Sequence, residues 1–235
     1  MTTFETRPSL MELIDRLDGE LIVSCQAPSG HPMRDTQTIA RVAKSVLMGG
    51  AGGLRINSPA DIREIRAFTD VPIIGLYKEA GKRRDVITIH KEQARDLALA
   101  GADIVAVDTT SEVCDNIPEM LRSTAAACEV ALVADISTLE EGLLAWKSGV
   151  AFVGTTLSGY TPYTLRDDEA PDLTLISELA TRGVRVIAEG RFSTPAEVSR
   201  AFTFGAFAVV VGGAITDPAA ITRRFVATTP KHRKD

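Results

Sequence analysis

The feature that most constrains this chain is a series of eight short apolar segments spread along its whole length. Within them apolar and polar residues do not alternate, and such continuous runs are typical of parallel strands covered on both faces. We therefore expect eight buried parallel strands. Their sequences are LIVSC at 21–25, GLRI at 53–56, PIIGLY at 72–77, DIVAVD at 103–108, VALVAD at 130–135, AFVGTT at 151–156, VRVIAE at 184–189 and AVVVGG at 208–213.

The stretches between these segments have the period of amphipathic helices. In residues 36–50 the apolar stripe consists of Ile39, Val42, Ala43, Val46 and Leu47, which suits a helix lying on a sheet. Capping patterns predict helix starts at Ser58-Pro59, at Asp217-Pro218, at Ser137 with Glu140, and at Thr194 with Glu197. Glycines that suit the left-handed end of a helix stand at 101, 149, 183 and 205.

Eight alternations of strand and helix predict parallel strands joined by right-handed crossovers. Two closures compete, a (β/α)8 barrel and a doubly wound open sheet. No Gly-x-Gly-x-x-Gly follows the first segment, so the dinucleotide-binding sheet lacks its main support. The count of eight and the length of 235 residues favour the barrel. We expect a single α/β domain spanning residues 1–235, with a core at about 10–227 and a short basic tail at Lys231 to Lys234.

Composition narrows the class of protein further. The 26 basic and 31 acidic residues give a formal charge of −5, which argues against a nucleic-acid partner. No apolar stretch approaches the ~20 residues of a membrane span, and the first twenty residues lack the apolar core of a signal peptide. The three cysteines, an odd number without metal or redox spacing, predict free thiols in a reducing compartment. These features predict a soluble cytoplasmic protein without a membrane partner.

In a barrel of this type the active site lies at the carboxyl ends of the strands. After the seventh and eighth segments, Gly190-Arg191 and Gly212-Gly213 place glycines directly before a helix. Backbone N–H groups there can approach an anion closely, and the helix dipole favours it. Because the two turns lie on adjacent strands, they predict a phosphate site. Thr155, at the end of the sixth segment, is a further substrate-binding candidate.

The acid–base candidates are Lys78 and Glu189, after the third and seventh segments. Strands four apart in an eight-stranded barrel face each other, so both side chains reach a bound substrate from opposite sides. Burial and neighbouring cations lower a lysine pKa and make it a usable base, although an ion pair with a nearby carboxylate is an equally good interpretation of Lys78. Arg55 is placed to stabilise an enolate-like oxyanion, and Asp135 either orients a substrate hydroxyl and tunes Lys78 or caps the next helix. The charged segment 79–85 is expected to be a mobile loop over the site.

Metal chemistry is not expected. The histidines, His31, His90 and His232, do not share a helix face or a strand end. The inward histidines and aspartates used by metal-dependent sugar-phosphate epimerases are absent, and only magnesium held by carboxylates alone stays open. We therefore predict neither a metal nor another cofactor.

Five strings, in order, resemble the N-acylglucosamine-6-phosphate 2-epimerase family, also called N-acetylmannosamine-6-phosphate 2-epimerase, over residues 10 to 227. They are LIVSCQA at 21–27, ADISTLEEG at 134–142, FVGTTLSGYT at 152–161, VIAEGR at 186–191 and VVGGAIT at 210–216. The combination is specific, whereas no single string would be.

This resemblance implies a cytoplasmic, cofactor-free homodimer that interconverts N-acetylmannosamine 6-phosphate and N-acetylglucosamine 6-phosphate in amino-sugar and sialic-acid catabolism. It implies an exchange of the C-terminal helix between subunits as one form of the dimer. By motif match, the catalytic lysine and glutamate fall on Lys78 and Glu189. Substrate binding falls on Gln26, Arg55 and Asp135, and phosphate binding falls on the backbone around Gly190, Arg191, Gly212 and Gly213.

One departure from the family concerns the phosphate. Members often carry arginine right after Ala-Ile-Thr, where this chain has Asp217. An acid beside a phosphate is unfavourable, so we expect Asp217 to turn away and cap the last helix. The stretches 29–36 and 79–86 also differ from the family pattern.

The expected mechanism begins with the open-chain sugar, whose C1 aldehyde acidifies the C2 proton. Lys78 removes this proton, Arg55 and Gln26 stabilise the enediolate oxygens, and the proton returns from Glu189 or from Lys78. Two rivals stay open at this point. One is an aldol or decarboxylation reaction on another phosphorylated substrate, and the other is a sugar-phosphate sensor without turnover.

Overall fold

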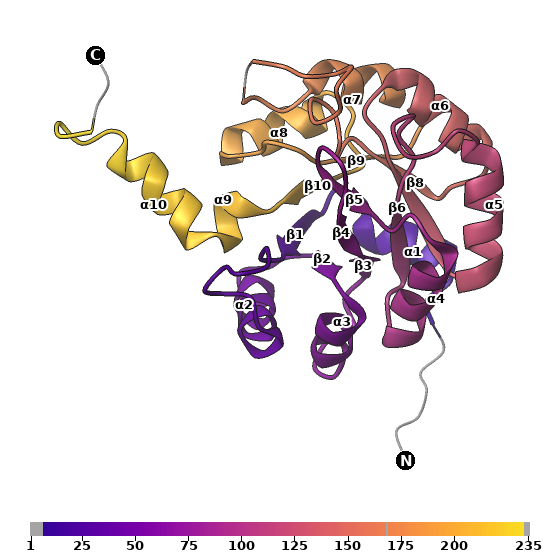
Figure 1. The fold of residues 1–235 in the computed structure, drawn as a ribbon, viewed down its shortest axis with the longest axis horizontal. Coiled ribbons are helices and arrows are strands. Elements are labelled where there is room, and N and C mark those ends of the chain that lie inside the picture. The colour runs from indigo at the N-terminus through magenta and orange to yellow at the C-terminus, as the bar shows by residue number, and fades with distance from the viewer. Residues whose placement is uncertain (1–6, 168, 233–235) are drawn as a thin grey trace.

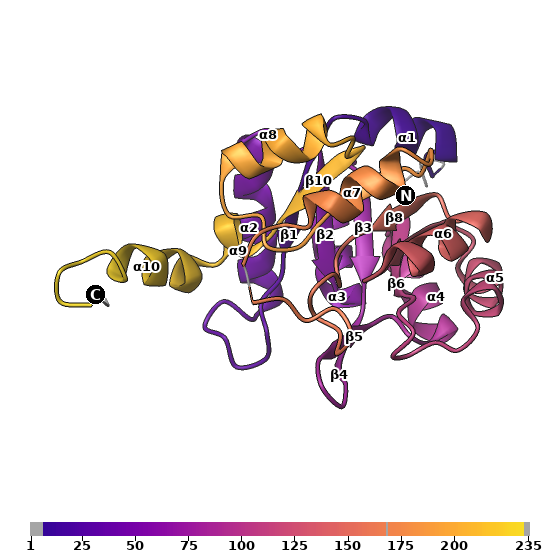
Figure 2. The same ribbon diagram turned by 90° about the horizontal axis from the view of Figure 1, so that it is seen from above.

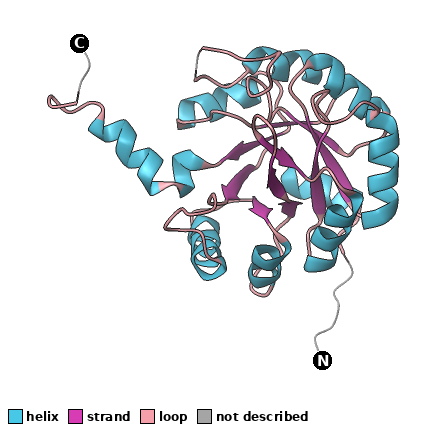
Figure 3. Cartoon of the chain, in the orientation of Figure 1, coloured by secondary structure: helices cyan, strands magenta, loops and turns pink. Residues whose placement is uncertain are grey.

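The computed structural model describes residues 7–167 and 169–232. Its central element is a closed barrel of eight parallel strands ringed by helices (Figures 1 and 3). Around the barrel the strands follow the order β1 (Leu21–Cys25), β2 (Gly53–Asn57), β3 (Ile73–Leu76), β6 (Ile104–Asp108), β7 (Ala131–Asp135), β8 (Phe152–Gly154), β9 (Val186–Ala188) and β10 (Ala208–Val211). Each strand coincides with one of the eight apolar segments, with β2 one residue longer than its segment, so the predicted barrel is confirmed.

The strands close because β10 pairs with β1, with Leu21 opposite Val209 and Val23 opposite Val211. Helices on the outside connect successive strands. They are α2 (Thr36–Met48), α3 (Pro59–Arg66), α4 (Lys91–Ala100), α5 (Ile117–Cys128), α6 (Leu139–Lys147), α7 (Leu173–Ala180) and α8 (Pro195–Thr203). The short α9 (Gly213–Thr216) follows the last strand. None of the helices in the described ranges is long and apolar enough to cross a lipid bilayer.

The buried residues form two clusters, one on each side of the barrel wall. The outer cluster, with residues such as Val23 and Leu54, packs against the helices. The inner cluster, with residues such as Phe152 and Ile187, also includes Leu13 and Leu17. The latter two belong to α1 (Leu10–Leu17), a helix that precedes the first strand and covers the amino-terminal end of the barrel (Figure 2).

One predicted helix start is wrong by one residue. The capping box of α6 uses Thr138 and Glu141, not Ser137 and Glu140. Glu141 is buried, and its carboxylate also accepts hydrogen bonds from Ser111 and from Tyr163. These hydrogen bonds explain why Glu141 and not Glu140 belongs to the capping box, because the exposed Glu140 could not accept them.

The segment 79–85 is also not the mobile loop that the sequence predicts. Residues 78–87 form a β-hairpin of β4 (Lys78–Ala80) and β5 (Asp85–Ile87), closed by a hydrogen bond from Gly81 N to Arg84 O. The hairpin projects beyond the strand ends, over the mouth of the barrel (Figures 1 and 2). Lys78 therefore begins a separate strand after β3.

The last helix, α10 (Pro218–Val226), leaves the barrel and has no buried residue (Figure 1). Asp217 caps it by accepting a hydrogen bond from Ala220 N at 2.9 Å, as predicted. Phe225, on this helix, is 72% exposed. The predicted basic tail from Lys231 to Lys234 lies in part outside the described residues.

Candidate functional site

The mouth of the barrel contains a buried arginine between two carboxylates. Arg55, in the middle of β2, is 1% exposed. It binds Asp135 of β7 through two contacts, Nη2 to Oδ2 at 2.6 Å and Nη1 to Oδ1 at 3.3 Å. Its Nη1 also lies 3.1 Å from Glu189 Oε2, just after β9. Strands from different sides of the barrel thus bring three predicted site residues into one network.

The charge balance of this network holds Arg55 in its cationic form. Burial disfavours the charged guanidinium, but Asp135 and Glu189 outweigh this effect and raise the pKa of Arg55 above its ordinary value. Asp135 faces Arg55 and does not cap α6, whose cap is Thr138. The structure therefore favours the functional interpretation of Asp135 over the capping one.

Two threonines after β8 connect this network. Thr156 Oγ1 lies 2.7 Å from Asp135 Oδ1 and 3.1 Å from Glu189 Oε2, so it bridges both carboxylates. Thr155 instead donates to the Glu189 carbonyl and accepts from the Glu189 N–H, which fixes that backbone. A substrate contact of Thr155 stays a prediction. Both threonines stand at a strand end in the sequence, and adjacent side chains of a strand point to opposite sides. Thr156 therefore contacts the two carboxylates, whereas Thr155 contacts the backbone of Glu189.

Lys78 stands at the opposite side of the mouth, at the start of the hairpin. Its side chain still meets solvent, yet protein surrounds it on most sides, and this loss of hydration lowers the pKa of the ammonium. Nearby Arg55 lowers the pKa further, whereas Glu189, Asp85 and Asp135 oppose the shift. Among the described residues Lys78 has no ion-pair partner, which disfavours the ion-pair interpretation.

The pKa of Glu189 shifts in the other direction. Burial raises it and the charge of Asp135 raises it further, although Arg55, Lys78 and Thr156 act against this rise. The lysine is therefore biased towards its neutral form and the glutamate towards its protonated form. Such a pair can remove a proton on one side of a ligand and supply one on the other.

Two buried polar atoms near the mouth have no hydrogen-bond partner among the described residues. They are Gln26 Oε1, an acceptor, and Arg55 Nε, a donor. The amide nitrogen of Gln26 is bound to Ser24 Oγ at 2.7 Å, which fixes the orientation of the amide. Because unpaired buried polar atoms are costly, these two are suited to the hydroxyl and carbonyl oxygens of a ligand.

Four backbone N–H groups after β9 and β10 are also free. Those of Gly190, Arg191, Gly212 and Gly213 have no acceptor within the described part of the chain. Gly190 and Arg191 both adopt positive φ, at 107° and 61°. The two turns follow strands paired in the barrel, so their free donors lie at one edge of the mouth.

The side chain of Arg191 points away from these donors. It bonds the carbonyls of Ser158 and Gly159 at 3.1 and 2.8 Å and lies over the ring of Tyr160. A Cβ at position 159 would lie 2.2 Å from Arg191 Nη1, so only glycine leaves room for this contact. At the mouth of the barrel, the backbone N–H of Arg191 is therefore available to a ligand, whereas its guanidinium is bound to the protein.

The predicted contribution of the α8 dipole is reduced. Glu197 accepts hydrogen bonds from the N–H groups of Ser193 and Thr194, and so occupies the amino terminus of that helix. Asp217 lies near the other turn, with Oδ1 3.8 Å from His31 Nε2. An anion at this edge would thus depend mainly on the four free N–H groups.

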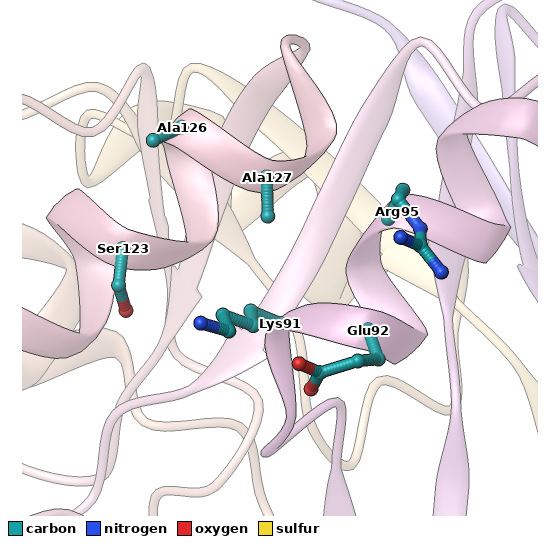
Figure 4. Close-up of a pocket in the computed structure, with 6 residues that line it drawn as sticks. All are labelled: Lys91, Glu92, Arg95, Ser123, Ala126 and Ala127. Atoms are coloured by element: carbon teal, nitrogen blue, oxygen red, sulfur yellow. The ribbon is translucent and has the colours of Figure 1, made fainter.

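Two surface hollows lie elsewhere on the molecule. One cavity of about 400 Å³ lies between α4 and α5 and is lined by Lys91, Glu92, Arg95, Ser123, Ala126 and Ala127 (Figure 4). Another, of about 370 Å³, lies beside Leu10 and the residues that begin β7 and β8. Neither is lined by a predicted site residue. No group of three metal-ligating side chains occurs among the described residues.

Comparisons with known proteins point to one family. Residues 39–231 match the family described as "Putative N-acetylmannosamine-6-phosphate epimerase". A relative of that description from Caldanaerobacter subterraneus subsp. tengcongensis is 42% identical, over 95% of this chain and 96% of its own. Another from Yersinia pestis (strain Pestoides F) is 43% identical, over 88% and 89%.

A solved structure extends the comparison to the fold. The N-acetylmannosamine-6-phosphate 2-epimerase from Clostridium perfringens superposes with a TM-score of 0.86 at 35% identity, over 97% of this chain and 100% of that one. Sequence and structure thus agree over nearly the whole length, and the chain belongs to the N-acetylmannosamine-6-phosphate epimerase family.

Proposed function

We propose that this protein is a cofactor-independent 2-epimerase that interconverts N-acetylmannosamine 6-phosphate and N-acetylglucosamine 6-phosphate. The observation that carries the proposal is that Lys78 and Glu189 follow β3 and β9, which lie four strands apart in the closed barrel, and that their pKa values are shifted towards each other. Epimerisation needs a proton to leave one face of a carbon and another to arrive on the opposite face. Two groups facing each other across a barrel meet this need.

The reaction starts from the open-chain sugar, in which the C1 aldehyde acidifies the C2–H bond. Neutral Lys78 takes the C2 proton, and the electron pair of that bond moves towards the aldehyde oxygen. Arg55 Nε, the unpaired donor, stabilises this oxygen. Glu189 then donates its proton to the other face of C2, which leaves Lys78 as ammonium and Glu189 as carboxylate. The reverse reaction starts from that protonation state.

The remaining polar groups orient the sugar. Gln26 Oε1 accepts from a sugar hydroxyl, and Asp135, held by Arg55 and Thr156, orients another. The phosphate binds to the free N–H groups of Gly190, Arg191, Gly212 and Gly213, and this anchoring places C2 between Lys78 and Glu189. Anchoring through a remote group supplies orientation at the reacting carbon.

Conversion in deuterium oxide tests the proposal. Purified protein is incubated with N-acetylmannosamine 6-phosphate, and the products are followed by proton NMR. We expect N-acetylglucosamine 6-phosphate with deuterium at C2. Failure to convert the substrate would overturn the assigned reaction, and conversion with protium retained at C2 would overturn the proton-transfer mechanism.

We further propose that the protein works as a homodimer in the cytoplasm, in the breakdown of amino sugars such as those released from sialic acid. Support for the dimer comes from α10, which buries no residue on its own barrel and exposes Phe225 and Val226. Support for a reducing compartment comes from Cys25, Cys114 and Cys128, all of which are free. A second subunit would cover the apolar side chains of α10.

A further inference from the structure

The hairpin that carries Lys78 is fastened at its tip by Arg84, a residue outside the site described above. Arg84 lies in the turn between β4 and β5, and its guanidinium reaches the end of β6. Nη1 lies 2.6 Å from Asp108 Oδ2 and Nη2 lies 3.2 Å from Asp108 Oδ1. Nε lies 2.9 Å from Glu112 Oε2, in the loop after β6.

The geometry leaves Arg84 no free donor. Its two remaining N–H groups go to the Asp85 carbonyl and to Thr110 Oγ1, at 2.9 and 2.8 Å. All five N–H groups therefore have an acceptor within the protein. Arg84 cannot bind a substrate without giving up one of these bonds, so its role is to hold the hairpin.

Asp108 is a rigid attachment point. Its carboxylate is fully buried and also accepts hydrogen bonds from the N–H and the hydroxyl of Thr110. The opposing carboxylates Asp108 and Glu112 raise the pKa of Arg84 above its ordinary value, although burial acts against this. A bidentate arginine contact of this kind is strong and fixes direction as well as distance.

The base of the hairpin is fastened separately. Lys78 N donates to Asn57 Oδ1 at 3.1 Å, and Tyr77 and Thr88 exchange hydrogen bonds where the hairpin leaves the barrel. Two attachments, one on β2 and one on β6, thus fix the hairpin at both ends. Lys78 itself has no ion-pair partner among the described residues, and the hairpin backbone sets the point from which its side chain extends.

We propose that Arg84 is a positioning residue of the epimerase: its attachment to Asp108 keeps the hairpin over the mouth and Lys78 directed at the substrate. This inference rests on the proposed function. With the attachment broken, the hairpin lifts, Lys78 becomes better hydrated, and its distance from Arg55 grows. Both changes favour the ammonium form. The carboxylates that face Lys78, those of Glu189, Asp135 and Asp85, already act in that direction.

The first test compares Arg84→Met with Arg83→Met, whose side chain is exposed in the same turn. For Arg84→Met we expect kcat to fall on the order of 100-fold, as for a misplaced catalytic group, while KM changes much less. The limb of the pH profile that reports Lys78 moves to higher pH. Arg83→Met keeps the kcat, KM and pH profile of the wild type.

Because Arg84→Met leaves a buried carboxylate without a partner, that variant can fail to fold. The double variant Arg84→Met/Asp108→Asn removes both charges and is used alongside it. We expect it to fold and to show the same fall in kcat and the same shift of the pH profile. Arg84→Lys, which keeps the charge without the bidentate contact, regains part of kcat.

Hydrogen–deuterium exchange gives a readout that does not depend on activity. The amides of residues 78–87 should exchange faster in the double variant than in the wild type, and those of β7 and β9 should not change. The proposal is overturned if kcat and the pH profile of the double variant match the wild type, or if kcat falls without a shift of the profile. Absence of C2 exchange in the wild type would overturn the proposed function instead, and hairpin exchange would still report on the attachment.

Discussion

At the scale of single residues, the site depends on how a few charges shift one another. Arg55 is paired with Asp135 and Glu189 and also lies near Lys78, so one cation acts on both proposed acid–base groups. Its charge lowers the pKa of Lys78 and works against the rise of the pKa of Glu189. The titrations of Lys78 and Glu189 are thus coupled, and a change in the charge of Arg55 would affect the pKa values of both.

Replacement of Lys78 by methionine removes the proposed base and preserves most of the volume of the side chain. We expect the rate of deuterium incorporation at C2 to fall by about 10²–10⁴-fold, while the affinity for sugar phosphate, measured by calorimetry, stays close to that of the wild type. The control is Lys82→Met, an exposed lysine of the hairpin turn. An equal loss in both variants would contradict a catalytic role of Lys78.

Replacement of Asp135 by asparagine tests the electrostatic coupling. The negative charge of Asp135 favours the protonated forms of both Lys78 and Glu189 and so raises both pKa values. Without that charge both pKa values fall. We therefore expect both limbs of the pH profile of kcat/KM to move to lower pH. A shift of one limb alone, or of either limb to higher pH, would contradict this network.

The sequence predicted which residue types meet at the mouth but not how they pair. Lys78, Glu189, Arg55 and Asp135 follow from the rule that strand ends form the site. The ion pair between Arg55 and Asp135 and the bridge made by Thr156 could not follow, because they depend on side-chain direction at the end of a twisted strand. The strand pattern alone does not record that direction.

At the scale of elements, buried carboxylates hold the loops of the mouth in place. Glu141, at the start of α6, accepts from Ser111 N and Oγ, from the N–H groups of Ser137 and Thr138, and from Tyr163 Oη. One carboxylate therefore joins the loops after β6, β7 and β8. Asp108 does the same for the hairpin through Arg84.

Glu141→Ala should destabilise the protein far more than Glu140→Ala. Loss of the buried carboxylate leaves several donors unpaired, and we expect the free energy of unfolding to fall on the order of 3 kcal/mol. Glu140 is exposed, and its replacement should change stability by less than about 0.5 kcal/mol. Urea unfolding followed by circular dichroism measures both. Equal effects would contradict the observed capping register.

The same two elements mark the limit of prediction at this scale. Adjacent residues Ser137-Thr138 and Glu140-Glu141 offer two capping boxes of equal spacing, and the sequence pattern does not distinguish them. The choice is made by contacts from Ser111 and Tyr163, which are distant in the sequence. Likewise, the hairpin at 78–87 is polar and charged, so its local sequence pattern does not distinguish it from a loop. The residue that holds it, Asp108, lies on another strand.

At the scale of the whole molecule, the closed barrel was predictable because the count of eight segments, the chain length and the lack of a Gly-x-Gly-x-x-Gly turn favoured it over a doubly wound sheet. Eight parallel strands with helical crossovers close on themselves, and the pairing of β10 with β1 completes the barrel. The helix α1 was not among the predicted elements, since it is short and precedes the first strand. The outward course of α10 was likewise not readable from its pattern.

Truncation after Thr216 tests the proposed dimer. The chain then lacks α10, which buries no residue and donates a hydrogen bond from Arg224 to Ser193 O in the loop before α8. We expect the truncated barrel to keep its circular dichroism spectrum and to sediment as a monomer at concentrations where the full chain is a dimer. A truncated chain that still sediments as a dimer would place the interface elsewhere.

The position of Lys78 and Glu189 on opposite sides of the barrel axis has a consequence for metabolic flux. In the proposed mechanism each group removes a proton in one direction and returns one in the other, so the same two groups serve both directions. A catalyst lowers the barrier of both directions alike and leaves the equilibrium unchanged. The supply and consumption of the two sugars in the cell would therefore set the direction of net conversion.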